Sequence, residues 1–423
     1  MYTYEQLACA DRLFGSSYYI FDSEKLKENY RKINQAFASR YPRFLIGYSY
    51  KTNYLPQLCA LINKLGGYAE VVSRLEYDLA LKIGVDPSRI IYNGPVKEAA
   101  DIEAALHGKS LLNLDSFYEI ELVKRYCEAY PERMVSVGLR VNFDLQENGV
   151  NPLQDGREAS RFGFCVENGA FQRAVEELSR IPSLRISGLH GHFSSDRSLA
   201  VYEKIAGKLC QLARVCLPET VEYIDVGGGI YGELPPSFPI QNTPTFDDYA
   251  EAVCRVMHAE MAAYGHVPLL ILEPGIAMAA NAFSFVCKVI DVKDVRGQTF
   301  VLVDGSVHNV KPTMHRHNLP HQIVRRQNGG EPGVFHVVGY TCMERDCLLH
   351  QVTGKLPRAG DYFIFENTGA YTMVFNPPFI KGRPPIVQRC ENEWRELRGR
   401  ETLAQFFSDQ LYRFEPLSVS KIR

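Results

Sequence analysis

The chain has 423 residues, of which 46% are hydrophobic and 23% charged, and its formal net charge is -2. This length exceeds the size at which one hydrophobic core usually stops growing, so two domains are expected. The charge balance argues against nucleic-acid binding, and no apolar stretch predicts a membrane span or a signal peptide. Eleven cysteines are scattered without a repeated spacing, which favours free thiols in the cytoplasm over a disulfide framework.

Short apolar segments alternate with amphipathic helical patterns from residue 44 onward. The predicted strands are Phe44–Tyr50, Tyr68–Val72, Arg89–Tyr92, Leu111–Leu114, Val135–Val141, Ile186–His192, Tyr223–Val226 and Leu269–Leu272. The predicted helices include Leu55–Leu65, Leu75–Ile83, Phe117–Tyr130, Leu199–Cys216 and Phe246–Tyr264, two of them preceded by the capping-box spacings Ser73–Glu76 and Ser116–Glu119. Eight strands, each followed by a helix, predict an α/β fold, a TIM-like (β/α)8 barrel, with a doubly wound open sheet as the alternative.

The pattern changes near residue 284 to turn-separated β segments, which predict a C-terminal all-β domain of barrel or sandwich type. Its expected strands are Phe285–Val295, Thr299–Val303, Val334–Val338, Tyr362–Glu366 and Tyr371–Phe375, and His308–Gly333 is expected to be an irregular loop. An early strand, Tyr18–Phe21, is expected to join this domain. The predicted boundaries are residues 1–29 joining the β domain, 30–284 for the barrel and 285–423 for the β domain.

Polar residues collect at the predicted carboxyl ends of the strands, where the active site of such a barrel lies. They are Lys51, Glu70, Asn93, Arg140, His192, Gly227–Gly229 and Glu273. Lys51 ends an apolar strand, so desolvation of its stem is expected to let the amine lose its proton near neutral pH. Such an amine forms Schiff bases with carbonyl compounds and with pyridoxal phosphate, although most isolated strand-end lysines are merely solvated.

Three further patterns each allow two interpretations. Gly227–Gly229 follow a strand, where they predict either a phosphate-binding backbone or a tight turn. His190 and His192 share one strand face, so they are either metal ligands or one core histidine beside one that stacks on an aromatic cofactor. A buried Glu273 needs a cation, which is either a protonated pyridine nitrogen or a barrel lysine or arginine. A further histidine group, His315, His317 and His321, is interpreted as incidental.

Together with Ser160–Gly163, Cys342–Asp346 and Gly369–Tyr371, these segments resemble, in order and over nearly the whole chain, the fold-type III pyridoxal-phosphate decarboxylases, the diaminopimelate and ornithine decarboxylase family. The resemblance implies that Lys51 carries the cofactor, that His192 stacks on its ring and that Glu273 pairs with its nitrogen. It also implies cofactor contacts from Glu70, Arg140, Ser195, Gly227, Gly228, Gly229, Gly275 and Tyr371. Cys342 matches a catalytic proton donor, and Lys311, Glu344 and Asp346 match substrate-binding positions. The family contributes the cysteine and aspartate from a neighbouring subunit, which implies a homodimer with shared active sites.

The sequence also departs from the family pattern. Ile276 replaces the arginine of Glu-Pro-Gly-Arg, Ser194 replaces a glycine, Glu70 stands where aspartate is frequent, Met343 follows the cysteine, and Lys311 replaces an arginine. These changes disfavour standard diaminopimelate. The ending Asp346–Leu348 is more similar to family members from antibiotic or siderophore pathways, so polyamine or secondary-metabolite biosynthesis is the expected setting.

The expected reaction is the release of carbon dioxide from the α-carbon of an amino acid or a derivative, either free or tethered to a carrier protein. Two other activities stay open. An amino-acid racemase would use the same barrel and lysine with a second acid or base. A metal-dependent hydrolase would use His190 and His192 and ignore Lys51.

Overall fold

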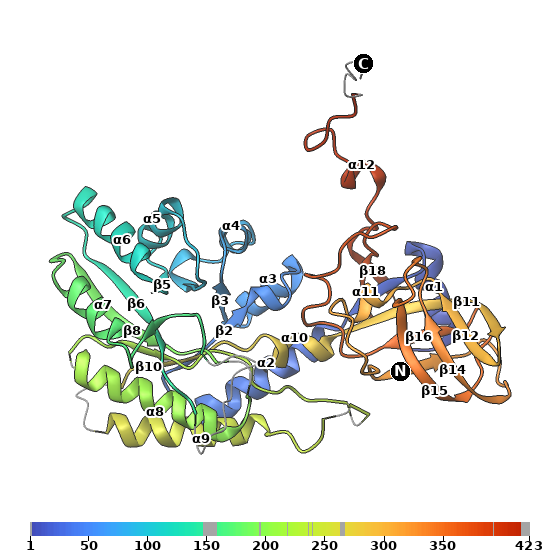
Figure 1. Cartoon of the computed structure of the whole chain (residues 1–423), viewed down its shortest axis with the longest axis horizontal. Coiled ribbons are helices and arrows are strands. Elements are labelled where there is room, and N and C mark those ends of the chain that lie inside the picture. Colours follow the sequence, from blue (N-terminus) through green and yellow to red (C-terminus); the bar gives the residue numbers. More distant parts are fainter. Residues whose placement is uncertain are drawn as a thin grey trace, which may run out of the picture. The chain divides into compact units, whose positions relative to one another are not determined.

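The computed structural model describes residues 2–146, 159–193, 196–217, 219–235, 237–238, 240–262, 267–391 and 393–415. The chain divides into two compact units, which can be followed in Figure 1 by the colours that run from the N-terminus to the C-terminus. The barrel unit contains Ser23–Ala282 and Gly369–Val374, and the β unit contains Met1–Asp22, Phe283–Thr368 and Phe375–Arg423. Tyr371 therefore belongs to the barrel unit, although it lies far along the chain from the barrel strands.

The barrel unit is built on eight parallel strands that close on themselves. These are β2 (Phe44–Ser49), β3 (Tyr68–Val71), β4 (Ile90–Tyr92), β5 (Leu111–Leu114), β6 (Val135–Asn142), β8 (Leu184–His190), β9 (Tyr223–Asp225) and β10 (Leu269–Leu272). Closure comes from pairing of β10 with β2, in which Leu270 lies opposite Phe44, and a two-residue strand, β7 (Phe164–Cys165), adds to β6. The predicted TIM-like barrel is confirmed, and the open-sheet alternative is wrong.

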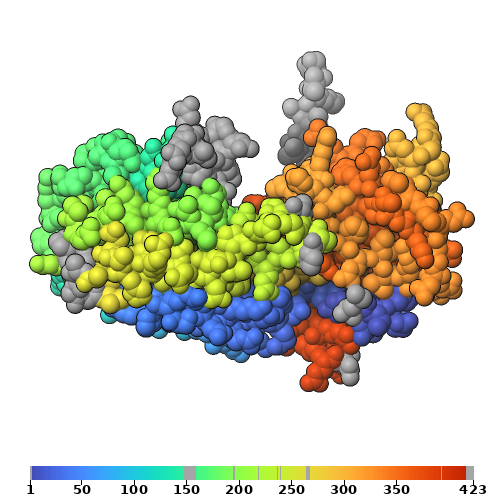
Figure 2. Space-filling model, turned by 90° about the horizontal axis from the view of Figure 1, so that it is seen from below, coloured from blue at the N-terminus to red at the C-terminus, as the bar shows by residue number. Residues whose placement is uncertain are grey.

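Helices cover the outside of the barrel because each has one apolar face. They are α2 (Ser23–Ala38), α3 (Pro56–Lys64), α4 (Arg74–Lys82), α5 (Ala99–His107), α6 (Phe117–Ala129), α7 (Ala170–Ser179), α8 (Leu199–Cys216), α9 (Phe246–Met261) and the short α10 (Ile276–Ala279). In α7 the buried side chains Phe171, Ala174, Val175 and Leu178 follow the helical period. Helix α9 packs against both α8 and α2, and the three can be followed by colour in Figure 2. None of the helices in the described part of the chain has the length and apolar character needed to cross a membrane.

The two predicted capping boxes are wrong in detail. Ser73 does cap α4 by accepting from the N–H of Glu76, but the Glu76 carboxylate accepts from Val72, one residue before the cap. At α6 the Ser116 side chain makes no capping bond, and Glu119 accepts from the N–H of Asp115. Both glutamates are buried, so their carboxylates bond to donors inside the protein instead of completing the exposed reciprocal pair.

The β unit contains one mixed sheet of nine strands. These are β1 (Tyr18–Phe21), β11 (Phe283–Val295), β12 (Gln298–Val303), β13 (His321–Val324), β14 (Pro332–Val338), β15 (Cys347–Lys355), β16 (Tyr362–Phe365), β17 (Ile386–Cys390) and β18 (Glu393–Arg398). Three helices belong to the same unit, α1 (Tyr4–Phe14), α11 (Val307–Val310) and α12 (Leu403–Phe406). The early strand β1 pairs antiparallel with β11 and parallel with β17.

Two predictions about the C-terminal part of the chain are wrong. Residues 371–375 form no strand, because Tyr371 has a φ of 54° and its N–H donates to the Thr52 carbonyl. The segment His308–Gly333 is not irregular throughout. It contains most of α11, which Ser306 and Asn309 cap reciprocally, and the strand β13, which pairs with β16.

Candidate active site

The residues that end the barrel strands converge on one pocket. It has a volume of about 240 Å³ and is lined by Ser49, Lys51, Thr52, His192, Arg197, Gly229, Glu273, Gly275, Ile276 and Tyr371. These residues come from the carboxyl ends of four strands, the loop before α8, the start of α10 and the returning segment at 369–374. The structure therefore brings polar residues together at the carboxyl ends of the barrel strands, where the sequence predicted the site.

Lys51 lies in a single turn of 3-10 helix that follows β2, with its side chain 30% exposed. Its Nζ donates to Glu70 Oε2 at 2.5 Å and lies 3.4 Å from Ser49 Oγ. Desolvation lowers the pKa of Lys51, but the charges of Glu70 and Glu273 outweigh it and raise the pKa above its usual value. The prediction that Lys51 loses its proton near neutral pH is therefore wrong for the protein without a cofactor. The carboxylates of Glu70 and Glu273 lie near its amine and favour the charged form.

Asn93, just after β4, connects the two buried carboxylates. Its Nδ2 donates to Glu273 Oε1 at 2.6 Å and to Glu70 Oε1 at 3.0 Å. Its own Oδ1 accepts from Asn113 Nδ2 at 2.8 Å, and Asn113 Oδ1 accepts from the Tyr223 hydroxyl at 2.7 Å. This chain of neutral amides and a phenol crosses the barrel and fixes the orientation of both carboxylates without adding charge.

Glu273 follows β10 and is 1% exposed. Burial raises the pKa of Glu273, but His190 and Lys51 lower it by more than burial raises it. The net shift is downward, which favours the ionised form of Glu273. Asp225, at the end of β9, shows the opposite behaviour, because burial and the neighbouring charge of Glu273 raise its pKa far above the usual range. Burial therefore favours the protonated form of Asp225, whereas the neighbouring positive groups favour the ionised form of Glu273.

His192 is held as a neutral ring. Its Nδ1 accepts a hydrogen bond from the N–H of Gly228 at 2.9 Å, so that nitrogen carries no proton. Burial, together with the charges of Lys51 and Arg140, lowers the pKa of His192 well below its usual value. The ring thus faces the pocket as an uncharged aromatic surface.

His190, His192 and Glu273 together offer three ligand atoms that lie within 4.8 Å of one another. Glu273 supplies the third ligand atom because its strand, β10, lies two places from β8 in the closed barrel. However, the lone pair of His192 Nδ1 already accepts from Gly228, which competes with a metal ion for the same atom. The geometry therefore favours a ring-stacking and carboxylate site over a metal centre.

The glycine segment permits backbone contacts that no other residue would allow. Gly227 and Gly229 have φ values of 70° and 97°, and a Cβ on Gly228 would lie 2.0 Å from the Glu273 carbonyl oxygen. Gly227 N–H donates to Asp225 and Gly228 N–H to His192. Of the three predicted phosphate contacts, only Gly229 has an amide with no partner among the described residues, and it lines the pocket.

Gly275 and Tyr371 close the same side of the pocket. A Cβ on Gly275 would lie 2.0 Å from Thr52 Oγ1, and Gly275 is the residue that begins α10. The Tyr371 N–H donates to the Thr52 carbonyl at 3.0 Å, which fixes its position beside Lys51. Ile276, where the family has arginine, also lines the pocket, and so does Arg197, whose guanidinium lies 5.1 Å from the centre of the Tyr231 ring.

Arg140 lies behind this pocket, near the end of β6. Its guanidinium lies 3.5 Å from Asp115 Oδ1, donates to the His192 carbonyl at 3.4 Å and stacks on Phe162. Burial lowers its pKa, which the charges of Asp115 and Glu273 partly oppose. Arg140 thus supports the segment that carries His192. Ser194 and Ser195 lie outside the described residues.

The predicted substrate residues belong to the β unit. Cys342 and Glu344 are exposed on the turn that joins β14 and β15. Asp346 is 3% exposed, and its two carboxylate oxygens accept from the N–H groups of Val307 and Thr341 and from Ser306 Oγ. Lys311 is 2% exposed and donates to the His317 carbonyl at 3.3 Å. Asp346 therefore anchors its own turn, and its role as a substrate reader stays a prediction.

Several site residues were not singled out for a role from the sequence. Asn93 was noted only for its position, and Asn113, Asp225 and Arg197 were not noted at all. Asn113 and Asp225 did carry a signal, because each is a polar residue inside an otherwise apolar strand, in Leu111–Leu114 and Tyr223–Val226. Arg197 carried none, since an arginine before a helix is usually solvated.

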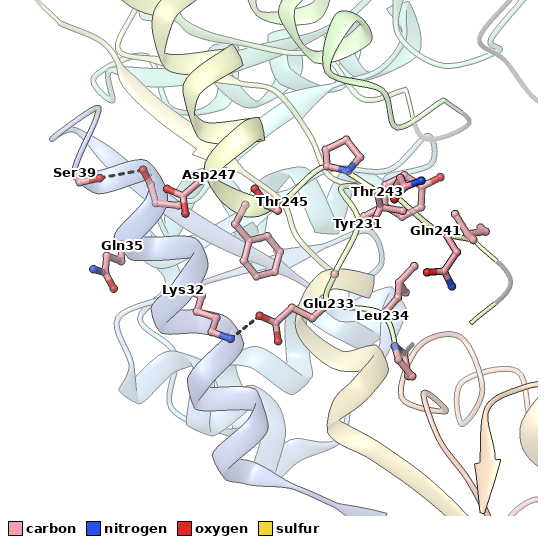
Figure 3. A pocket seen from close by; sticks show the side chains of 17 residues that line it. Lys32, Gln35, Ser39, Tyr231, Glu233, Leu234, Gln241, Thr243, Thr245 and Asp247 are labelled. Carbon is pink, nitrogen blue, oxygen red and sulfur yellow. Dashed lines mark hydrogen bonds and ion pairs between the residues drawn. The ribbon is translucent and has the colours of Figure 1, made fainter. Parts of the chain in front are cut away.

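A larger pocket, of about 530 Å³, lies elsewhere in the barrel unit between α2 and residues 231–247 (Figure 3). Lys32 points across it to Glu233, and that ion pair is partly exposed. Of the residues predicted to bind cofactor or substrate, none that the structure describes lines this pocket. Its size alone does not make it the active site. Among the described residues that line it, none is a buried titratable side chain with a shifted pKa, which is a common feature of active sites.

Comparison with known proteins gives consistent matches. Residues 24–280 match the family described as pyridoxal-dependent decarboxylase, pyridoxal binding domain. A diaminopimelate decarboxylase of Actinosynnema pretiosum subsp. auranticum is 30% identical over 92% of this chain and 87% of its own length. One of Helicobacter pylori strain J99 is 25% identical over 98% of both chains.

Solved structures show the same fold. The diaminopimelate decarboxylase of M. jannaschii, in complex with L-lysine, aligns with a TM-score of 0.86 at 24% identity, over 96% of this chain and 95% of that one. The lysine/ornithine decarboxylase of Vibrio vulnificus, in complex with putrescine, aligns with a TM-score of 0.73 at 19% identity, over 91% and 98%.

Proposed function

Because the chain belongs to the family of pyridoxal-dependent decarboxylases, we propose how its own residues decarboxylate an amino acid and why that amino acid is not standard diaminopimelate. The observation that carries the proposal is the grouping of Lys51, an ionised Glu273 and a neutral His192 around one pocket. Each has the chemistry that one part of the cofactor requires.

The donor set fits pyridoxal phosphate group by group. Lys51 would supply the amine for the aldehyde, Glu273 the carboxylate for the pyridine nitrogen, and His192 an uncharged imidazole for the ring. The Gly229 amide, the start of α10 at Gly275 and Tyr371 lie where a phosphate needs small, hydrogen-bonding neighbours. When bound, the cofactor supplies an electron sink for the pair left by the departing carboxylate.

The chain supplies charge and orientation for that step. Glu273 would keep a proton on the ring nitrogen, and the raised pKa of Asp225 disfavours a second negative charge beside it. Glu70 Oε2, 2.5 Å from Lys51 Nζ, is placed to take a proton from the ammonium group, which would free the amine to hold the cofactor. We propose that the Cys342 thiol returns a proton to the α-carbon, since it is exposed on a turn and not committed to packing.

The substrate proposal rests on Ile276 and Arg197. An isoleucine at position 276 removes a cation from the pocket, which lowers affinity for a substrate with an additional carboxylate. Arg197 lines the same pocket, and none of the ion pairs formed by the described residues includes it. We propose that Arg197 supplies the missing positive charge from the loop before α8 and so selects a substrate of different shape from diaminopimelate.

The test is carbon dioxide release from cofactor-loaded protein given diaminopimelate, lysine, ornithine or longer amino-acid derivatives, free and carrier-bound. We expect release from at least one of these and little from diaminopimelate. Turnover of diaminopimelate at the efficiency of its decarboxylases would overturn the substrate proposal, and loss of chirality without gas release would indicate a racemase. Arg197→Met should raise KM for the substrate more than Arg173→Met, which removes an exposed arginine that also stacks on a ring.

We also propose a homodimer that shares its active sites, in the cytoplasm. All eleven cysteines are free thiols, as a reducing compartment predicts. Large apolar side chains are exposed along the β unit's C-terminal segment, at Leu403, Phe407, Leu411, Tyr412 and Phe414. Exposed apolar groups in such a run are typical of a surface that another chain covers.

Mixing two inactive variants tests the shared site. Lys51→Ala and Cys342→Ala, unfolded and refolded together, should recover about a quarter of wild-type activity, because half of randomly paired dimers are mixed and each of these has one intact site. Recovery of no activity by the mixture, or an active monomer in sedimentation, would contradict the proposal. Each variant refolded alone is the control.

A further inference from the structure

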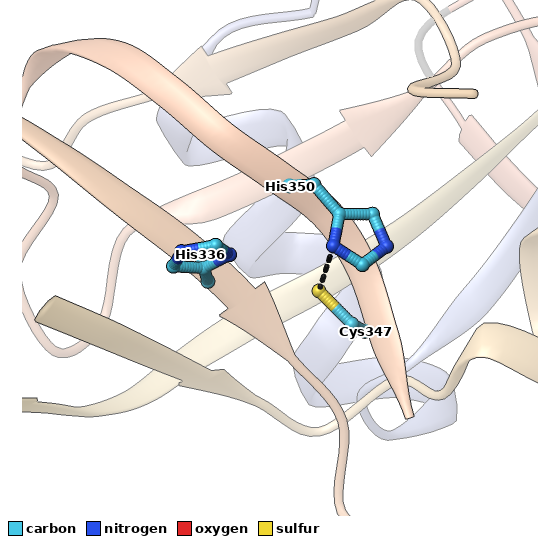
Figure 4. A group of neighbouring side chains, drawn as sticks. All are labelled: His336, Cys347 and His350. Atoms are coloured by element: carbon cyan, nitrogen blue, oxygen red, sulfur yellow. Dashed lines mark hydrogen bonds between the residues drawn. The ribbon is translucent and has the colours of Figure 1, made fainter. Parts of the chain in front are cut away.

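Three side chains with metal-binding chemistry meet in the β unit, apart from the site described above. They are His336 on β14 and Cys347 and His350 on β15, and Figure 4 shows them facing one another across the two strands. Their ligand atoms all lie within 4.8 Å of one another, and Cys347 Sγ is 3.4 Å from His350 Nδ1. No residue of this group lines the Lys51 pocket.

Two bulges in β15 explain why these side chains share one face. Residues three apart on a regular strand point to opposite sides of the sheet. Here the pairing moves from Val338–Cys347 to Val337–Leu349, so β15 has one additional residue between them. That insertion restores Cys347 and His350 to the same side.

The second bulge places the third ligand. Between the Val337–Leu349 and Phe335–Val352 pairs, His336 alone lies opposite His350 and Gln351, and Gln351 has a φ of 50°. Phe300 of the neighbouring strand β12 stacks on the His336 ring, with centroids 5.6 Å apart. Stacking thus covers one face of the His336 ring, and one ring nitrogen lies within 4.8 Å of the Cys347 and His350 ligand atoms.

The donor types favour a borderline-soft divalent ion. Zinc bonds of about 2.0–2.3 Å to nitrogen and sulfur place tetrahedral ligand atoms about 3.5 Å apart, so the Cys347–His350 separation already fits. The His336 nitrogen lies within 4.8 Å of the other two ligand atoms and would have to move closer to complete the site. Among the described residues no carboxylate belongs to the group, which leaves magnesium and calcium without their oxygen ligands.

Two observations act against an ion and limit the kind of site this can be. Cys347 Sγ donates to the Leu349 carbonyl at 3.1 Å, a weak bond that a metal would replace. The Lys311 ammonium is close enough to act electrostatically on both Cys347 and His350. It repels any cation, so only an ion that gains strongly from thiolate and imidazole bonds would remain bound.

We propose that His336, Cys347 and His350 bind one Zn²⁺-like ion, with a fourth position open to water. The ion would join β14 to β15 at the base of the turn that carries Cys342 and Glu344. This proposal does not depend on the identity of the substrate, because the site lies within the β unit alone.

The test is cobalt binding to the full-length, cofactor-loaded protein after chelation and dialysis. We expect about one equivalent of Co²⁺ to produce a thiolate-to-cobalt charge-transfer band, which Zn²⁺ then removes by competition. Cys347→Ser should abolish the band, and His350→Gln should weaken cobalt binding by about tenfold or more. The matched control is Cys390→Ser, which removes an exposed cysteine of the same unit and should leave the band unchanged.

The proposal is overturned by wild-type protein that shows no saturable band, or by a band that persists in Cys347→Ser. Cobalt held by His190, His192 and Glu273 would give no such band, because that group contains no sulfur. The two histidine groups are therefore distinguished in one spectrum.

Discussion

Replacing Asn93 by alanine removes the donor that connects both buried carboxylates of the active site. The side chain is 3% exposed, and its Nδ2 lies 2.6 Å from Glu273 and 3.0 Å from Glu70. A hydrogen bond to a charged group contributes about 1.5–3 kcal/mol, and about 1.4 kcal/mol corresponds to a tenfold change in an equilibrium constant. Loss of the Glu273 bond alone should therefore weaken cofactor binding by about 10- to 100-fold.

The assay is titration of cofactor-free protein with pyridoxal phosphate, followed by visible absorbance, with thermal unfolding measured in parallel. The matched control is Asn29→Ala, because Asn29 is equally buried in the barrel unit and donates to the Met278 carbonyl at 2.9 Å, away from the carboxylates. Asn29→Ala should lower stability but leave cofactor affinity unchanged. If Asn93→Ala binds the cofactor within about threefold of wild type, or if both variants weaken binding equally, the proposed role of Asn93 is wrong.

Three further predictions concern groups buried in the barrel unit. Burial raises the pKa of Glu76 from 4.5 to about 7. As the pH rises, the unfolded chain therefore loses this proton before the folded protein does, and the free energy of unfolding falls between pH 4.5 and 7. This pKa difference corresponds to about 3 kcal/mol. Glu76→Gln should therefore unfold at a higher temperature than wild type at pH 8 but not at pH 4.5, and equal gains at both would contradict this reasoning. Lys97→Met leaves Glu119 buried and unpaired, since Lys97 Nζ lies 3.0 Å from Glu119 and neither side chain is exposed. It should cost about 3–5 kcal/mol in denaturant unfolding, most of it recovered when Glu119→Leu is added, and a single variant as stable as wild type would be the adverse result. Gly228→Ala should displace the backbone N–H that donates to His192 and abolish cofactor absorbance, because the new Cβ would lie 2.0 Å from the Glu273 carbonyl oxygen. The control is Gly84→Ala. Gly84 has a φ of 84° and no atom within 4 Å of a new Cβ, so this variant should affect stability only.

The sequence by itself determined the barrel and the position of its active site. Period-two and period-3.6 hydrophobic patterns are local, and eight such pairs have few ways to bury their apolar faces. For the same reason Lys51, His192 and Glu273 could be assigned to one end of the strands before their distances were known. The motif around Lys51 and the glycine segment then carried the resemblance to a family.

Only the tertiary structure decided charge states and cross-strand partners. The raised pKa of Lys51 depends on Glu70 and Glu273, which are 19 and 222 residues away, and a strand pattern records no such distances. The Asn93–Asn113–Tyr223 chain, the opposite pKa shifts of Asp225 and Glu273, and the pocket lined by both Arg197 and Ile276 all join different strands or loops. The meeting of His336, Cys347 and His350 required two bulges, which reverse the alternation of side chains that sequence patterns assume. Local patterns determine which face of an element is buried, whereas closure of the barrel and the register of the sheet determine which polar groups meet there.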